Sequence, residues 1–99
     1  MSQQRRLAAI LFTDIVGYTS MMQENEVKAI NVVKRYHSIL GAAVSGYSGE
    51  ILNDYGDGSL CVFSSATEAL QAALELQKNL NDDAPIPLRV GLHIGEIVL

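Results

Sequence analysis

Apolar positions along the chain change their spacing from one segment to the next, and each spacing predicts a kind of element. Residues 6–14 are an almost unbroken apolar run that ends in an acid, which is typical of a buried strand. Between Glu24 and about Tyr47, apolar side chains recur every three or four residues, which predicts a helix with one buried face. That face would consist of Val27, Ile30, Val33, His37, Leu40 and Val44.

The second half of the chain repeats this change from strand spacing to helix spacing. Two short apolar runs, at about 50–55 and 59–63, flank an Asp-Gly pair, which predicts a tight hairpin turn. Ser65 and Glu68 then match a capping box at the start of a second helix. A polar loop with two prolines leads to a last strand over residues 88–99. The predicted apolar face of the second helix is Ala69, Leu70, Ala73, Leu76 and Leu80.

The predicted order is β-α-β-β-α-β, the ferredoxin-like split unit. This is an α+β fold in which helices cover one face of an antiparallel sheet. The usual strand order, 4-1-3-2, makes the first and third strands central antiparallel neighbours, so the end of one lies beside the start of the other. Asp14 is at the first of these places and Asp57 is at the second. We therefore expect the two acids to meet at one edge of the sheet.

Composition narrows the classes of function. The 99 residues form one domain, and a net charge of -4 argues against nucleic acid as the main partner. No run approaches the roughly 18 apolar residues of a membrane span. Cys61 is the only cysteine, which favours a reducing compartment, and we expect a cytoplasmic protein. The last strand pattern stops without a polar terminator, so we expect residues 1–99 to belong to a longer protein; a naturally short domain is the alternative.

Two carboxylates at one place repel each other unless one is protonated or a cation lies between them. Mg²⁺ takes one or two carboxylates and completes its shell with water and substrate phosphates. After Asp14 the chain turns through Gly17 towards a helix, whose N–H groups favour phosphate, and Thr19 would add a hydroxyl. The alternative is that Asp14 only caps that helix and Asp57 only makes the turn.

Three ordered stretches, "FTDIVGYTSMMQ", "GDGSLCVFSSATEALQAALELQ" and "LRVGLHIGEIV", resemble the class III nucleotidyl cyclase catalytic domain, the adenylate and guanylate cyclase family. The resemblance runs from about Arg6 to Leu99. It implies that Asp14 and Asp57 bind two Mg²⁺ or Mn²⁺ ions and that the backbone carbonyl of Ile15 coordinates one of them. Four consecutive residues would cradle a triphosphate with their backbone: Val16, Gly17, Tyr18 and Thr19.

The resemblance also implies the reaction, which is cyclisation of a nucleoside triphosphate to a 3′,5′-cyclic monophosphate with release of pyrophosphate. Arg89 matches a basic residue that contacts phosphate; a solubilising charge at a strand edge is its alternative. Adenylate cyclases of the family usually have Lys three residues before the Gly-Asp pair, to select the purine. Asn53 stands there and is the base-reading candidate. ATP is the expected substrate, with GTP or a pyrimidine triphosphate still open.

Family members use further residues beyond "GLHIGEIVL", and a partner subunit supplies them. We therefore expect a homodimer or a pseudo-dimer with a partner cyclase domain, and no turnover by residues 1–99 alone. Two alternatives remain: a related two-metal enzyme such as a diguanylate cyclase, or a degenerate homology module that binds nucleotide or a partner, which Asn53 supports. We expect His37 to be a buried core histidine and Tyr55 to pack within the sheet, with stacking of Tyr55 on a base as its alternative.

Overall fold

The computed structural model describes residues 5–82 and 84–98, so the predicted end of the last strand at Leu99 lies outside the described residues. Its sheet is antiparallel with the order β2-β3-β1-β4, which confirms the predicted α+β fold and strand order. One short helix, α1, was not predicted. The elements are β1 (Arg5–Ile15), α1 (Tyr18–Glu24), α2 (Glu26–Gly46), β2 (Glu50–Asp54), β3 (Gly58–Phe63), α3 (Ala66–Leu80) and β4 (Leu88–Val98).

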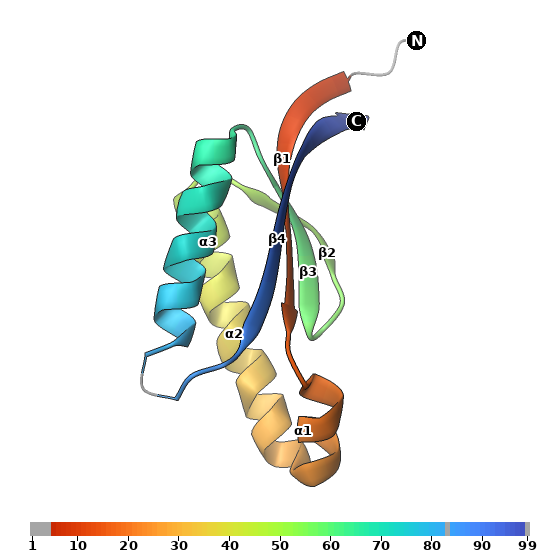
Figure 1. The fold of residues 1–99 in the computed structure, drawn as a ribbon, viewed down its shortest axis with the longest axis vertical. Coiled ribbons are helices and arrows are strands. Elements are labelled where there is room, and N and C mark those ends of the chain that lie inside the picture. Colours follow the sequence, from red (N-terminus) through yellow and green to blue (C-terminus); the bar gives the residue numbers. More distant parts are fainter. Residues whose placement is uncertain (1–4, 83, 99) are drawn as a thin grey trace.

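The molecule has two layers, with α2 and α3 side by side on one face of the sheet (Figure 1). The opposite face, here called the open face, is covered by neither of these helices. α1 lies at the end of the sheet where β1 ends, beside the first turns of α2 (Figure 1). Among the described residues, no helix combines the length and the apolar character needed to cross a membrane.

The core between sheet and helices includes Leu11 and Phe63 from the strands and Leu40 and Leu76 from the helices. The predicted face of α2 is partly wrong, because Val27 is 70% exposed and Ile30 is 40% exposed. The first turns of α2 extend past the sheet, so the sheet does not cover those two side chains (Figure 1). The residues that α2 buries are Ala29, Tyr36, Leu40, Ala43 and Val44.

The second long helix begins as predicted. The Ser65 hydroxyl accepts a hydrogen bond from the Glu68 N–H at 3.2 Å, which caps α3. Leu70, expected on the buried face of α3, is 51% exposed, and Ala72 is buried in its place. Ala72 has a small side chain, which suits close packing of helix and sheet. A search for large apolar side chains at helical spacing overlooks such a residue.

The hairpin between β2 and β3 forms, but its centre is one residue earlier than predicted. The Tyr55 N–H donates to the Gly58 carbonyl at 2.9 Å, so Gly56 and Asp57 are the central pair. Gly56 has φ 87° and Asp57 has no positive φ, the sign pattern of a type II′ turn. The Asp54 carboxylate accepts a hydrogen bond from the Gly56 N–H at 2.9 Å and so stabilises the turn.

Candidate active site

The ends of β1 and β3 bring the two predicted acids together. Asp14 lies opposite Gly58 in the register of these strands, and the Ile15 N–H donates to the Asp57 carbonyl at 2.7 Å. Both acids line one cavity. The expected juxtaposition of Asp14 and Asp57 is therefore observed.

Gly58 allows this close approach of β1 and β3. A Cβ atom at Gly58 would lie 2.8 Å from the Thr13 carbonyl oxygen and 3.2 Å from the Asp14 Cβ. A backbone oxygen at that distance cannot move aside without moving the strand. Glycine at this position is therefore required by the backbone that carries Asp14.

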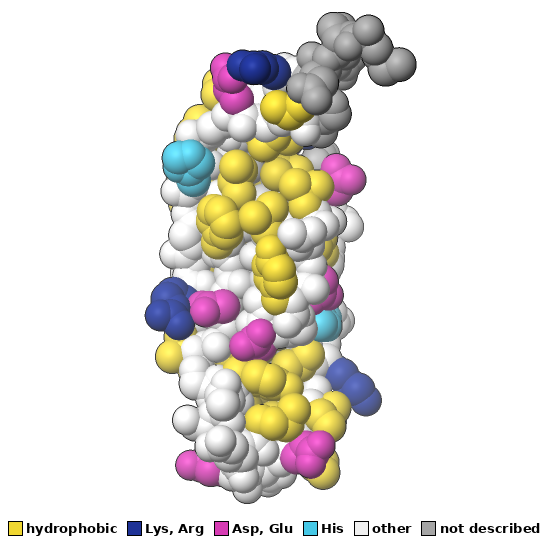
Figure 2. All heavy atoms as spheres, turned by 90° about the vertical axis from the view of Figure 1, so that its right-hand side faces the viewer, with side chains coloured by type: hydrophobic (Ala, Val, Ile, Leu, Met, Phe, Trp, Pro, Cys, Tyr) yellow, Lys and Arg dark blue, Asp and Glu magenta, His cyan; other side chains and the backbone are white. Residues whose placement is uncertain are grey.

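The cavity has a volume of about 550 Å³ and opens on the open face of the sheet. Leu11, Thr13 and Ile15 are buried towards the helices, so the alternating residues Phe12 and Asp14 point to the open face. Acidic side chains border an apolar patch on this face (Figure 2). The full lining is Phe12, Thr13, Asp14, Tyr55, Asp57, Gly58, Ser59, Arg89, Val90 and Gly91.

Arg89 enters the cavity from β4, where it lies directly opposite Asp14. Its guanidinium donates to both carboxylate oxygens, from Nε to Oδ1 at 3.0 Å and from Nη2 to Oδ2 at 3.2 Å. These charge-assisted bonds to Asp14 raise the pKa of Arg89 above its ordinary value. Arg89 is therefore paired with Asp14 beside the cavity.

The oxygen atoms near Asp14 and Asp57 suit a hard metal cation that takes only part of its coordination shell from the protein. Among the described residues, no group of three or more His, Cys, Asp or Glu side chains is arranged to hold a metal ion. The Ile15 N–H donates to Asp57, but the return bond from the Asp57 N–H to the Ile15 carbonyl is not formed. Two carboxylates and one free carbonyl suit Mg²⁺, whose remaining ligands are commonly water and phosphate.

The segment after Asp14 differs in part from the expected phosphate cradle. The Val16 N–H donates to the Pro87 carbonyl at 3.0 Å, so that group is already used. Gly17 has φ 73° and is the N-cap of α1, with no side chain capping the helix. None of the residues 16–19 lines the cavity that holds the acids. The available N–H groups of this segment therefore begin at Gly17.

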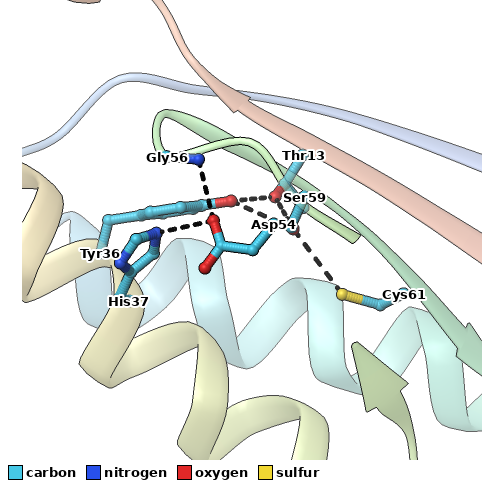
Figure 3. Close-up of polar contacts among 7 residues, drawn as sticks. All are labelled: Thr13, Tyr36, His37, Asp54, Gly56, Ser59 and Cys61. Carbon is cyan, nitrogen blue, oxygen red and sulfur yellow. Dashed lines mark hydrogen bonds and ion pairs between the residues drawn. The ribbon is translucent and has the colours of Figure 1, made fainter. Parts of the chain in front are cut away.

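On the helix side, three buried hydroxyls from Thr13, Tyr36 and Ser59 lie together (Figure 3). Thr13 Oγ1 is 2.5 Å from Tyr36 Oη and 2.6 Å from Ser59 Oγ, and Tyr36 donates to Ser59 at 3.1 Å. Burial raises the pKa of Tyr36, and the hydrogen bonds with Ser59 and Thr13 oppose the rise. Sequence reasoning missed this network, because its three members come from β1, α2 and β3.

His37 and Asp54 make a second contact between α2 and the hairpin (Figure 3). His37 Nε2 lies 3.1 Å from Asp54 Oδ1, an ion pair when the imidazole is protonated. It has no other polar partner among the described residues. The prediction of a buried core histidine is thus only partly right, since His37 is half-buried and faces a carboxylate.

Asn53 and Tyr55 lie where β2 runs into the hairpin. The Asn53 amide donates from Nδ2 to Tyr55 Oη at 3.0 Å, and Asn53 itself does not line the cavity. Tyr55 does line it and is 62% exposed. The prediction that Tyr55 packs within the sheet is wrong, because the ring extends from an edge strand next to a turn.

Known proteins resemble this chain over its whole length. The family profile for the adenylate and guanylate cyclase catalytic domain matches residues 1–99. "Putative adenylate cyclase 3" of Rhizobium meliloti (strain 1021) is 36% identical, and the match covers 99% of this chain and 18% of that protein. The chain therefore spans less than a fifth of the length of this relative.

Solved structures show the same likeness. An adenylate/guanylate cyclase/hydrolase from Silicibacter pomeroyi is 38% identical with a TM-score of 0.84, and the match covers 99% of this chain and 62% of that one. The guanylyl cyclase Cya2 is 25% identical with a TM-score of 0.82, and the match covers 99% of this chain and 58% of that one. The chain therefore corresponds to roughly three fifths of either solved chain.

Proposed function

The chain belongs to the family of adenylate and guanylate cyclase catalytic domains, and from that premise we propose that it converts a nucleoside triphosphate to a 3′,5′-cyclic monophosphate and pyrophosphate. ATP is the proposed substrate, with GTP or a pyrimidine triphosphate as alternatives because Asn53 replaces the usual Lys. The observation that carries the proposal is the meeting of Asp14 and Asp57 in one cavity at the end of the sheet.

We propose that Asp14, Asp57 and the Ile15 carbonyl hold two Mg²⁺ or Mn²⁺ ions. When bound, such ions would lower the pKa of the ribose 3′-hydroxyl and balance the charge of the triphosphate. The chain's own residues then hold and orient the substrate. The two carboxylates point into a cavity large enough for part of a nucleotide, which supports this assignment.

Arg89 has two roles in this proposal. In the absence of substrate it neutralises Asp14 through the two hydrogen bonds described above. Its side chain is 72% exposed, so it is free to turn away from Asp14 and contact a phosphate oxygen. The backbone of Gly17, Tyr18 and Thr19, rather than that of Val16, would supply further N–H donors to the triphosphate.

The open face supports a dimer. Phe12 is 46% exposed, Leu60 lies opposite it on β3, and Ile10 precedes it on the same face. An apolar patch covers this part of the surface (Figure 2), and exposed patches of this kind are typical of interaction sites. We propose that a second copy, or a partner cyclase domain, covers this face and supplies the rest of the active site.

The test is an assay of the full-length protein with Mn²⁺ and each of the four nucleoside triphosphates, measuring both cyclic nucleotide and pyrophosphate. Asp57→Asn removes one charge of the proposed metal site with little change of shape. We expect turnover to fall roughly a hundredfold or more, the usual cost of removing one group that stabilises developing charge. Glu50→Gln, which neutralises an exposed acid on the same hairpin away from the cavity, is the matched control and should keep full activity.

Three results would contradict parts of this proposal. Unchanged turnover in Asp57→Asn would rule out its assigned role. No pyrophosphate from any of the four nucleotides would favour a homology module that only binds nucleotide or a partner. Cyclic nucleotide formed by residues 1–99 alone would contradict the need for a second domain, because we propose that they bind nucleotide weakly and do not turn it over.

A further inference from the structure

Tyr55 and Asn53 form a hydrogen-bonded pair beside the cavity that holds the two acids. The Tyr55 backbone is fixed by the hairpin bond from its N–H to the Gly58 carbonyl, at 2.9 Å. The far end of its ring is fixed by the Asn53 amide, which donates to Oη at 3.0 Å. A ring held at both ends and still 62% exposed has lost much of its freedom without gaining a packed environment.

The cavity has two kinds of lining. Asp14, Asp57 and Arg89 supply charge, while Phe12, Val90 and Tyr55 supply apolar and aromatic surface. A nucleoside triphosphate has the same two parts, a polyanion that needs cations and a flat base that needs an apolar or aromatic surface. The lining therefore suits a ligand that is charged at one end and aromatic at the other.

The strand register separates these two parts in space. Asp14, Gly58 and Arg89 lie opposite one another and form one row across the open face. Phe12, Leu60 and Asn53 form the next row of the same face. Rows of one face are two residues apart, or about 7 Å along a strand. The Tyr55 backbone lies beside Gly58, in the row of the acids, and the Oη end of its ring reaches Asn53 in the next row. The ring therefore extends from the acids towards the second row, as a base extends from its phosphates.

We propose that the Tyr55 ring stacks on the base of the bound nucleoside triphosphate and that Asn53 is a positioning residue, which holds the ring in place. This inference rests on the proposed function, and it changes the expected role of Asn53. Asn53 bonds to Tyr55 and does not itself line the cavity, so its proposed action on the base is through the ring. Every base has a π-face, so stacking separates large bases from small ones and hardly distinguishes adenine from guanine.

The experiment compares two probes on the purified protein with Mn²⁺. One is the α,β-methylene analogue of ATP, which cannot release pyrophosphate, and the other is inorganic tripolyphosphate, which has no base. We expect Tyr55→Ala to weaken binding of the ATP analogue about tenfold or more, because stacking on one base is commonly worth that factor. Binding of tripolyphosphate should stay unchanged.

Three further variants sharpen the assignment. Tyr55→Phe and Asn53→Ala both remove the same hydrogen bond and keep an aromatic ring, so each should weaken the ATP analogue only about two- to fivefold. The double variant should be no worse than either single one. Leu52→Ala is the matched control, since Leu52 is an exposed side chain of the same strand that does not line the cavity; it should leave both affinities unchanged. The corresponding GTP analogue should bind about as well as the ATP analogue, and the pyrimidine analogues more weakly.

The outcomes separate this inference from the proposed function. If the unmodified protein binds the ATP analogue and Tyr55→Ala binds it equally well, stacking is overturned and the proposed function stands. If Tyr55→Ala weakens both probes to the same extent, Tyr55 only shapes the hairpin, and the inference is wrong. If the unmodified protein binds neither probe, the proposed function fails and this inference fails with it.

Discussion

The two faces of the sheet carry opposite chemistry at the same strand ends. Towards the helices, the hydroxyls of Thr13, Ser59 and Tyr36 are buried and bond to one another. Towards the open face, the neighbouring residue Asp14 meets Arg89 beside a cavity. Because successive side chains of a strand point to opposite faces, a step of one residue separates the two environments.

This difference indicates a division of labour within the sheet. Buried polar groups that bond to one another hold the backbone in one conformation, and their burial keeps them out of reach of a ligand. Exposed charges beside a cavity contribute little to folding and stay available for a ligand. Substitutions on the helix side should therefore change stability, and substitutions on the open side should change activity.

The largest expected effect is on the open face. Asp14→Asn should lower turnover roughly a hundredfold or more, because it removes a proposed metal ligand. The free energy of unfolding should change by less than about 1 kcal/mol, since the ion pair with Arg89 is solvent-exposed. Pyrophosphate release measures the turnover, and chemical denaturation of the same preparation measures the free energy of unfolding. A fall of several kcal/mol in the free energy of unfolding of Asp14→Asn would contradict the proposal that the open face serves activity and not stability.

The next largest effect is expected where the two faces meet. Gly58→Ala places a Cβ 2.8 Å from the Thr13 carbonyl oxygen, which forces β1 and β3 apart. We expect a loss of about 1–3 kcal/mol of stability, as for other overpacked sites, together with a loss of activity because Asp14 moves. Gly41→Ala, in α2 with no atom within 4 Å of the added Cβ, is the control and should be neutral or stabilising. Denaturant midpoints and turnover of both variants provide the measurement.

A smaller effect is expected on the helix side. Tyr36→Phe removes one hydroxyl and leaves the Thr13 hydroxyl bonded only to Ser59, which also accepts from the Cys61 thiol; we expect this to cost about 1–2 kcal/mol. Turnover per folded molecule should stay within about twofold, because the open face keeps all its groups. Thermal unfolding and active-site titration separate the two quantities. Tyr47→Phe, at the half-buried tyrosine that forms the C-cap of α2, provides the comparison. A large loss of turnover with unchanged stability would assign Tyr36 to the chemistry instead.

The meeting of the two acids was predictable because it depends on strand order and on position within strands. The apolar run before Asp14 marks the end of β1, and the short hairpin marks the start of β3. The β-α-β-β-α-β order makes β1 and β3 neighbours. The placement of the turn was less predictable. Asp57-Gly58 and Gly56-Asp57 are both good turn pairs, and the close approach of Gly58 to β1 is a tertiary constraint that no local pattern records.

The side-chain partners were not predictable from the sequence. Arg89 and Asp14 are 75 residues apart, and Tyr36 and Thr13 are 23 apart, so no local spacing marks either contact. The exposure of Val27 and Ile30 depends on α2 continuing past the sheet, which periodicity within the helix cannot reveal. What sequence reasoning lacked in each case was the position of one element relative to another.

The smallest expected effect tests the helix side by pH. Burial raises the pKa of Tyr36, so the folded protein favours the neutral phenol more than the unfolded chain does. The stability from this preference is complete below the ordinary tyrosine pKa of about 10, and it is lost as pH rises through the folded value. The free energy of unfolding should therefore fall more steeply above pH 10 in the unmodified protein than in Tyr36→Phe. If the free energy of unfolding fell equally steeply with pH in the two proteins, Tyr36 would ionise as freely as an exposed tyrosine. The buried hydroxyl network could not then be what stabilises the helix side of the sheet.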